Sequence, residues 1–236
     1  MKKKLLCIVL TVALLFTLSA CIGEKEKVIA ENEAANKDFI QASTQAIGDE
    51  TLALHEKLNW GESYDEVKDE VKGPYHNDSS QYITKAFYAN LPQNGEWIDE
   101  EKNIQPKNFV STDILAYYMI DPSLGLNEYG YMAADVNLYQ YDFLKMYYTK
   151  KYGEPEREDW EWKNESHIES ETDEEERYQL FEEGYIRVLT VWDIEELDSV
   201  LVIDWLKDPA KRDNNYGQIS FYKRTDEFSV ESMEEK

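Results

Sequence analysis

The chain has 236 residues, with 25 basic and 49 acidic side chains and a formal net charge of −24. So negative a surface repels phosphate backbones, which argues against sequence-independent binding to nucleic acid. The 17 Tyr, 8 Phe and 6 Trp supply enough large apolar surface to build a core, which argues against disorder along the whole chain.

Residues 1–20 have the composition of a secretory signal peptide. A run of three lysines from Lys2 forms a basic start, and an apolar run from Leu5 to Leu18 follows it. The run is too short for a membrane-spanning helix and lies directly before small residues. Removal of this leader leaves 22 basic and 49 acidic side chains, a net charge of −27.

The leader ends in Leu18-Ser19-Ala20-Cys21, which resembles the lipoprotein signal of bacteria. In that signal the cysteine receives a diacylglyceryl thioether and becomes the first residue of the mature chain. The other cysteine, Cys7, lies inside the leader, so Cys21 has no intramolecular partner for a disulfide. We therefore expect a lipid at Cys21 that anchors the protein to the extracytoplasmic face of a cell membrane. The alternative is an ordinary signal peptide that leaves a free thiol.

The sequence predicts an envelope type and five segments. The Lys-rich, Arg-poor and Tyr-rich composition favours a Gram-positive envelope. The segments are a removed leader over 1–20, a lipidated cysteine with tether and stalk helix over 21–50, α+β modules over 51–137 and 138–225, and a polar tail over 226–236.

Two helices are expected ahead of the first capping box. Helical spacing of apolar residues predicts a helix over 28–47, in the stalk segment, and a second over 49–58, where the first module begins. Ser63 and Glu66 form a capping box, and Gly73-Pro74 forms a stop with the glycine in the left-handed conformation. Alternation of side-chain character then predicts strands, which lie near 82–88, 110–120 and 128–136.

The second module is expected to repeat this order. Helical spacing over 139–151 ends at Gly153, and a short strand is predicted at 160–162. Thr172 and Glu175 form another capping box, for a helix that Gly184 ends. Three further strands are predicted near 185–192, 200–206 and 217–223.

These elements predict an α+β fold of two tandem modules, each with short helices packed on one face of an antiparallel meander sheet. The Trp60-Gly61-x-Ser63-x-x-x-Val67 opening, the Gly/Pro stop, the later Lys151-Tyr152-Gly153-Glu154-Pro155 and the aromatic-rich strands resemble tandem modules of the β-lactamase-inhibitor-protein-like fold. That fold also occurs in small lipoproteins of the outer-membrane assembly machinery and in many lipoproteins of Gram-positive bacteria. The resemblance covers roughly 54–223, and the acidic insertion over 163–176 departs from it.

The resemblance implies a curved antiparallel sheet in each module, with a sheet face often used for protein binding. Its motifs describe folding, so no functional residue is transferred from it.

Catalytic motifs are missing from the sequence. It has no Gly-x-Ser-x-Gly elbow, phosphate loop or His-Glu-x-x-His motif, and the one cysteine outside the leader is the expected lipid site. We therefore expect a protein that is not an enzyme. Carboxylates are too abundant for a catalytic pair to be picked out, so a carboxylate-dependent hydrolase remains an alternative.

Acidic side chains concentrate in the second module, where residues 154–183 hold 14 acidic and 3 basic side chains. The densest part contains the interaction candidates Glu169, Glu171, Asp173, Glu174, Glu175 and Glu176. These acids suit the start of a helix, because its dipole favours negative charge. They also suit a basic partner or Ca²⁺, although the spacing is not that of an EF-hand loop. No other cofactor is expected besides the lipid, and no metal site is assigned.

Aromatic residues of the second sheet are further interaction candidates, namely Trp160, Trp162, Trp192 and Trp205. Such residues dominate interface energetics when they are exposed and form cross-strand core pairs when they are buried. We expect a lipid-anchored protein that binds an unidentified protein, one with a basic surface, without catalysis. The alternative is a surface lipoprotein that binds a peptide or a glycan.

Overall fold

The structure is a computed structural model that describes residues 33–45, 57–94, 108–162, 173–207 and 216–225. Residues 33–45 are helical, within the helix expected over 28–47. The leader, the lipid site and nearly all of the helix expected over 49–58 lie outside the described residues. Of the helices that are described, none is long and apolar enough to cross a membrane.

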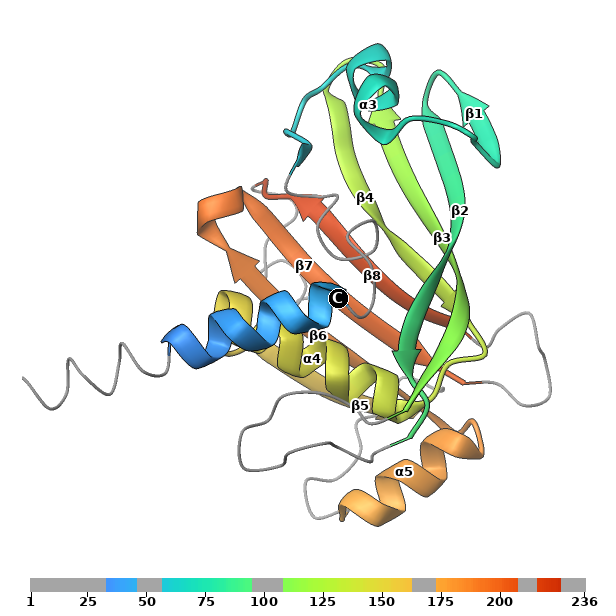
Figure 1. The fold of residues 1–236 in the computed structure, drawn as a ribbon, viewed down its shortest axis with the longest axis vertical. Helices are drawn as coiled ribbons and strands as arrows, with labels where there is room; N and C mark the ends of the chain where they lie inside the picture. The colour runs from blue at the N-terminus through green and yellow to red at the C-terminus, as the bar shows by residue number, and fades with distance from the viewer. Residues whose placement is uncertain (1–32, 46–56, 95–107, 163–172, 208–215, 226–236) are drawn as a thin grey trace, which may run out of the picture.

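Eight strands form one antiparallel sheet, in the order β1-β2-β3-β4-β8-β7-β6-β5 (Figure 1). The strands are β1 (Asn77–Ser79), β2 (Tyr82–Pro92), β3 (Phe109–Asp121), β4 (Gly125–Ala134), β5 (Arg157–Trp162), β6 (Ile186–Ile194), β7 (Ser199–Leu206) and β8 (Tyr216–Lys223). The labelled helices are α3 (Tyr64–Val71), α4 (Leu138–Tyr152) and α5 (Glu174–Glu182). The predicted α+β class with a meander sheet is confirmed. The strands expected in two modules form one sheet, because β4 pairs with β8.

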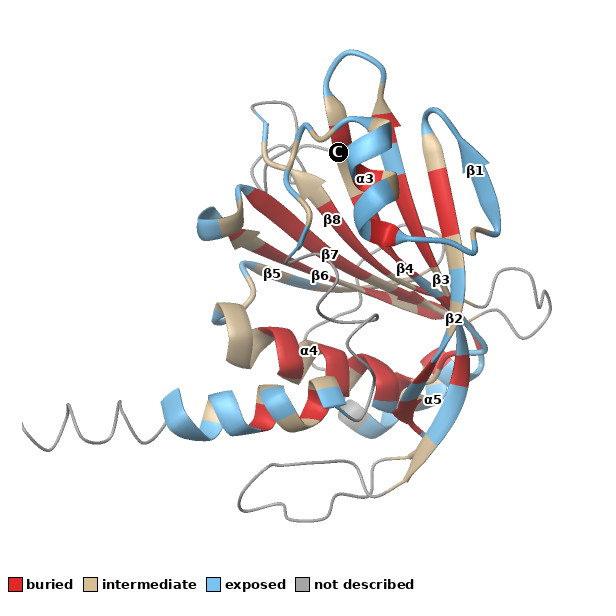
Figure 2. Cartoon of the chain, turned by 45° about the horizontal axis from the view of Figure 1, so that its top comes forward, coloured by how far each residue is buried: buried red, intermediate tan, exposed pale blue. Residues whose placement is uncertain are grey.

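Helix α4 supplies most of the helical part of the core. Its buried side chains include Tyr141, Phe143, Tyr147 and Tyr148, and the buried side of the helix faces the sheet (Figure 2). The hydroxyl of Tyr141 lies 2.7 Å from the Thr190 hydroxyl on β6, so this buried phenol has a polar partner. The helix ends at Gly153, whose φ of 93° is open to glycine, as predicted.

Helix α3 is held by the predicted capping box. The Ser63 backbone N–H donates to the Glu66 carboxylate at 2.8 Å, which satisfies one of the free donors at the helix start. Buried Val67 packs in the same core cluster as Tyr147 of α4, so both helices cover one face of the sheet, as predicted.

The prediction that Gly73 takes the left-handed conformation after α3 is wrong. Lys72, and not Gly73, takes a positive φ of 51°, and its backbone N–H donates to the Lys68 carbonyl at 3.1 Å. The backbone therefore reverses one residue earlier than the Gly/Pro stop indicates.

The cap of α5 also differs from the predicted one. Asp173 is the N-cap, and its carboxylate accepts the Glu176 backbone N–H at 2.8 Å, whereas Thr172 lies outside the described residues. The helix ends before Gly184, which has a φ of 77°, as predicted.

Trp60 joins the two halves of the chain. Its indole N–H lies 2.9 Å from the Leu197 carbonyl and 3.0 Å from the Ser199 hydroxyl, and its ring stacks on Tyr129 of β4 at 5.1 Å. A side chain that precedes α3 is thus bonded to the start of β7.

Candidate functional site

Side chains of a strand alternate between the two faces of a sheet, and here the faces differ. One face packs under α3 and α4. The other contains a separate apolar cluster around Val191, Val200 and Val202, to which no described helix contributes a residue. We call this second side the open face. Its central row crosses the sheet through Thr84, Tyr117, Gly130, Ser220, Val202 and Val191.

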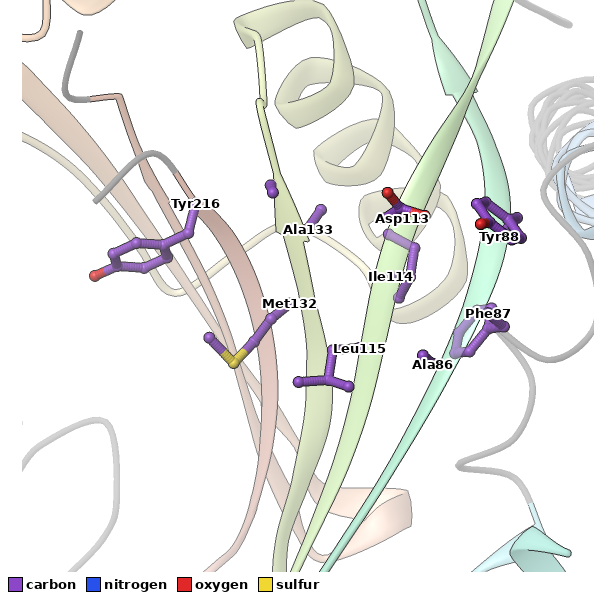
Figure 3. Close-up of a pocket in the computed structure, with 10 residues that line it drawn as sticks. Ala86, Phe87, Tyr88, Asp113, Ile114, Leu115, Met132, Ala133 and Tyr216 are labelled. Atoms are coloured by element: carbon purple, nitrogen blue, oxygen red, sulfur yellow. The ribbon is translucent and has the colours of Figure 1, made fainter. Parts of the chain in front are cut away.

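A hollow of about 580 Å³ lies on the open face over β2, β3, β4 and the start of β8 (Figure 3). Ala86, Leu115 and Met132 are register partners on adjacent strands and form its floor. Tyr88 and Tyr216 also line it, and we call the hollow the sheet groove. The Tyr88 side chain is 76% exposed and Met132 is 36% exposed. Large apolar side chains are therefore presented to solvent together.

The sheet groove has a single charge among the described residues that line it, the carboxylate of Asp113. Asp113 lies beside Tyr88 in the strand register and is exposed. The groove can thus receive apolar groups together with one cation.

A polar network lies next to the groove, in the centre of the open face. Tyr117 crosses over Gly130, where an added Cβ would lie 2.8 Å from the phenol oxygen. That oxygen is 2.8 Å from the Ser220 hydroxyl, accepts from the Gln218 amide at 3.0 Å and donates to the Glu128 carboxylate at 2.9 Å. The glycine makes room for a fully bonded, buried tyrosine on the face that no described helix covers.

Burial raises the pKa of two carboxyl groups on this face. Desolvation raises the pKa of Glu128, and the hydrogen bond from Tyr117 only partly offsets that effect. Desolvation likewise raises the pKa of Asp204 on β7, although the guanidinium of Arg187 lies 3.8 Å away. Both carboxyl groups therefore hold a proton to a higher pH than in an unfolded chain.

The open face has more acids than bases. The strand register places six described acidic side chains on it, those of Asp113, Glu128, Asp159, Glu161, Asp193 and Asp204. The basic side chains that the strands place there are those of Arg157 and Arg187. The open face is therefore negatively charged, as the whole chain is.

A second hollow, of about 240 Å³, lies between α4, β5 and α5. Its acids are bonded within the hollow: Glu158 pairs with Lys145, and Asp142 accepts the Tyr178 hydroxyl. The Arg177 guanidinium lies over the Trp160 ring at 5.4 Å. Because its acids are bonded within the protein, this hollow suits a structural role better than recognition.

The predicted aromatic candidates do not form an exposed platform. Trp192 and Trp205 are each 1% exposed, and their N–H groups donate to the carbonyls of Gly153 and Asn137 at 3.0 and 2.9 Å. They are core residues under α4, which removes them from the interaction candidates. Trp160 and Trp162 are half-buried on β5.

The predicted acidic cluster is only partly described. Glu169 and Glu171 lie outside the described residues, Asp173 caps α5, and Glu174 begins that helix. Glu175 and Glu176 are exposed on its first turn. Within the part of the chain that the structure covers, no group of three or more His, Cys, Asp or Glu side chains is placed to hold a metal ion.

The groove residues were not singled out in the sequence. Alternation over 82–88 places Ala86 and Tyr88 on one side of a strand, and the same period places Leu115 and Met132 on one side of theirs. That signal was present, but it does not indicate which side the helices cover.

The chain matches no protein-family model, no curated protein and no solved structure.

Proposed function

We propose that the protein is a lipid-anchored extracytoplasmic binding protein that holds another protein on the open face of its sheet, without catalysis. The observation that carries this proposal is the sheet groove, where Tyr88 of β2 and Met132 of β4 are exposed on either side of β3. Tyrosine and methionine are enriched at protein interfaces, and grouped exposed apolar side chains mark interaction surfaces.

The sequence supports both the location of this protein and the charge of its partner. The leader and Cys21 support a lipid anchor outside the cytoplasm. The net charge of −27 after removal of the leader and the acids of the open face favour a basic partner, because opposite potentials accelerate association and like potentials oppose it. The resemblance to a fold whose sheet face binds proteins agrees with this choice of surface.

Crosslinking in intact cells tests the binding surface. A photoreactive phenylalanine analogue replaces Tyr88 in the groove or, as the control, Leu124 at the β3–β4 turn, which is 66% exposed. We expect a discrete crosslinked product from position 88 and none from position 124. No product at either position, or the same product at both, would contradict the proposed surface.

The anchor has its own test. Cys21→Ala is expected to release the protein into the medium or to leave an unprocessed precursor, as measured by fractionation and mass spectrometry. Membrane association of a processed Cys21→Ala chain would contradict a lipid at this cysteine.

A further inference from the structure

The outer edge of β2 is only partly paired. β1 pairs with β2 over residues 82–84, whereas β2 continues to Pro92 (Figure 1). From residue 85 onward, no described strand lies on that side of β2. The sheet groove begins at the same edge, since Ala86 and Tyr88 line it.

Two hydrogen bonds show which way the β2 backbone faces. The Gln93 N–H donates to the Asn108 carbonyl at 3.0 Å, toward the β3 side. The Thr84 carbonyl accepts the His76 N–H at 2.8 Å, toward the opposite side. Because successive residues of an antiparallel strand alternate in direction, the even-numbered residues of β2 turn their N–H and C=O groups outward.

Ala86 and Tyr88 therefore present backbone donors and acceptors at the open edge, and both residues are exposed. Neither has a hydrogen bond on that side among the described residues. Their side chains point to the open face, so the free backbone groups and the groove adjoin.

The other edge of the sheet is protected in the usual way. β5 has the sequence Arg-Glu-Asp-Trp-Glu-Trp, and charged side chains discourage pairing with another chain. Residues 86–89 of β2, Ala-Phe-Tyr-Ala, contain no charge. This stretch thus lacks the protection found on the opposite edge.

We propose that an extended segment of the partner adds as a strand beside residues 86–88 of β2, with alternate apolar side chains over the groove and a lysine or arginine directed to Asp113. This inference rests on the proposed function and specifies its partner. Strand addition obtains affinity from backbone hydrogen bonds and specificity from pockets for alternate side chains. Asp113 is one strand further in than the edge, about 5 Å per strand, which is within reach of a long basic side chain.

A second copy of this chain is a poorer occupant of the edge. Two processed copies would bring together two charges of −27 and two exposed Asp113 carboxylates. Like charges across an interface oppose association, whereas a basic segment brings a cation, which none of the described residues that line the groove supplies.

A phage-displayed library of random dodecapeptides, selected on the detergent-solubilised full-length protein, tests the inference. Ala86→Pro removes the outward N–H and leaves the bonds to β3, since proline is tolerated at a strand edge. Ala86→Ser is the matched control that keeps the N–H. We expect enriched peptides with a basic residue between apolar residues at alternate positions, and about tenfold weaker binding to Ala86→Pro than to Ala86→Ser. Asp113→Asn should weaken binding several-fold and remove the preference for a basic residue.

A second measurement does not depend on the folding of the proline variant. N-methylation of alternate peptide residues blocks the bonds to one edge, so one methylated register should lose binding to the wild-type protein and the other should keep it. No enrichment, acidic peptides, equal binding to both Ala86 variants, or equal binding of both methylated registers would overturn strand addition. If position 88 still gives a crosslinked partner, the proposed function stands and only this mode of recognition fails; dimerisation through β2, seen by light scattering, would also overturn it.

Discussion

At the centre of the open face, Glu128 is held in a partly buried position by the Tyr117 hydroxyl. Burial raises the carboxyl pKa, so the folded protein binds this proton more tightly than the unfolded chain does. Below the ordinary glutamate pKa both states are protonated, and the group has no effect on stability. As the pH rises from that value to the raised folded pKa, the free energy of unfolding falls by the amount that the shift dictates.

Glu128→Gln should remove this penalty while it keeps an acceptor for Tyr117. We expect the variant to gain stability relative to wild type as the pH rises through the window above the ordinary pKa, with the thermal midpoint measured from about pH 4 to about pH 8. Glu70→Gln, an exposed change on α3, is the control. A Glu128→Gln difference that stays constant across this range would show that ionisation is not responsible.

At the scale of the elements, the helix starts depend on side-chain caps. Ser63→Ala removes a hydroxyl that lies 2.7 Å from the Glu66 carboxylate, and Glu66→Ala removes the acceptor of the Ser63 N–H. Each change should lower the free energy of unfolding by about 1 kcal/mol, measured by denaturant titration. The double variant should lose less than the sum, because both changes break one box. Full additivity, or an equal loss in Glu70→Ala, would argue against the cap.

Local patterns predict the elements better than they predict the site. Alternation located seven of the strands, and turn and cap residues located the helices, because these signals depend on near neighbours. The short polar strand β1 has no such signal. The pairing of β4 with β8 is not predicted either, since alternation does not indicate which strand lies next to which.

The same limit explains the site. The alternation of their strands would place Trp192 and Trp205 equally well on an exposed surface or in the core. Only the position of α4 shows that they face the core. Tyr117 is buried on the opposite face because Gly130, on the neighbouring strand, has no side chain to exclude it. Both facts depend on contacts between distant parts of the chain.

At the scale of the whole molecule, the two halves share one sheet and one core. β4 and β8 pair over seven register partners, and core residues of both halves belong to one cluster. Trp60 adds two hydrogen bonds from the first half to the second, at Leu197 and Ser199. Neither half can lose its structure without exposing the edge and the apolar surface of the other, so we expect a single cooperative transition.

Differential scanning calorimetry of the full chain should therefore show one peak, with equal calorimetric and van't Hoff enthalpies. Trp60→Phe keeps a ring on Tyr129 but removes the N–H donor, and should shift that peak downward without dividing it, at a cost of about 1–2 kcal/mol. Trp160→Phe is the matched control, because its N–H bonds to Glu158 within the same edge strand. We expect a smaller shift from it, since no bond between the halves is lost. Two peaks in the wild type, or one of two peaks moving alone in Trp60→Phe, would show that the halves unfold separately despite the common sheet.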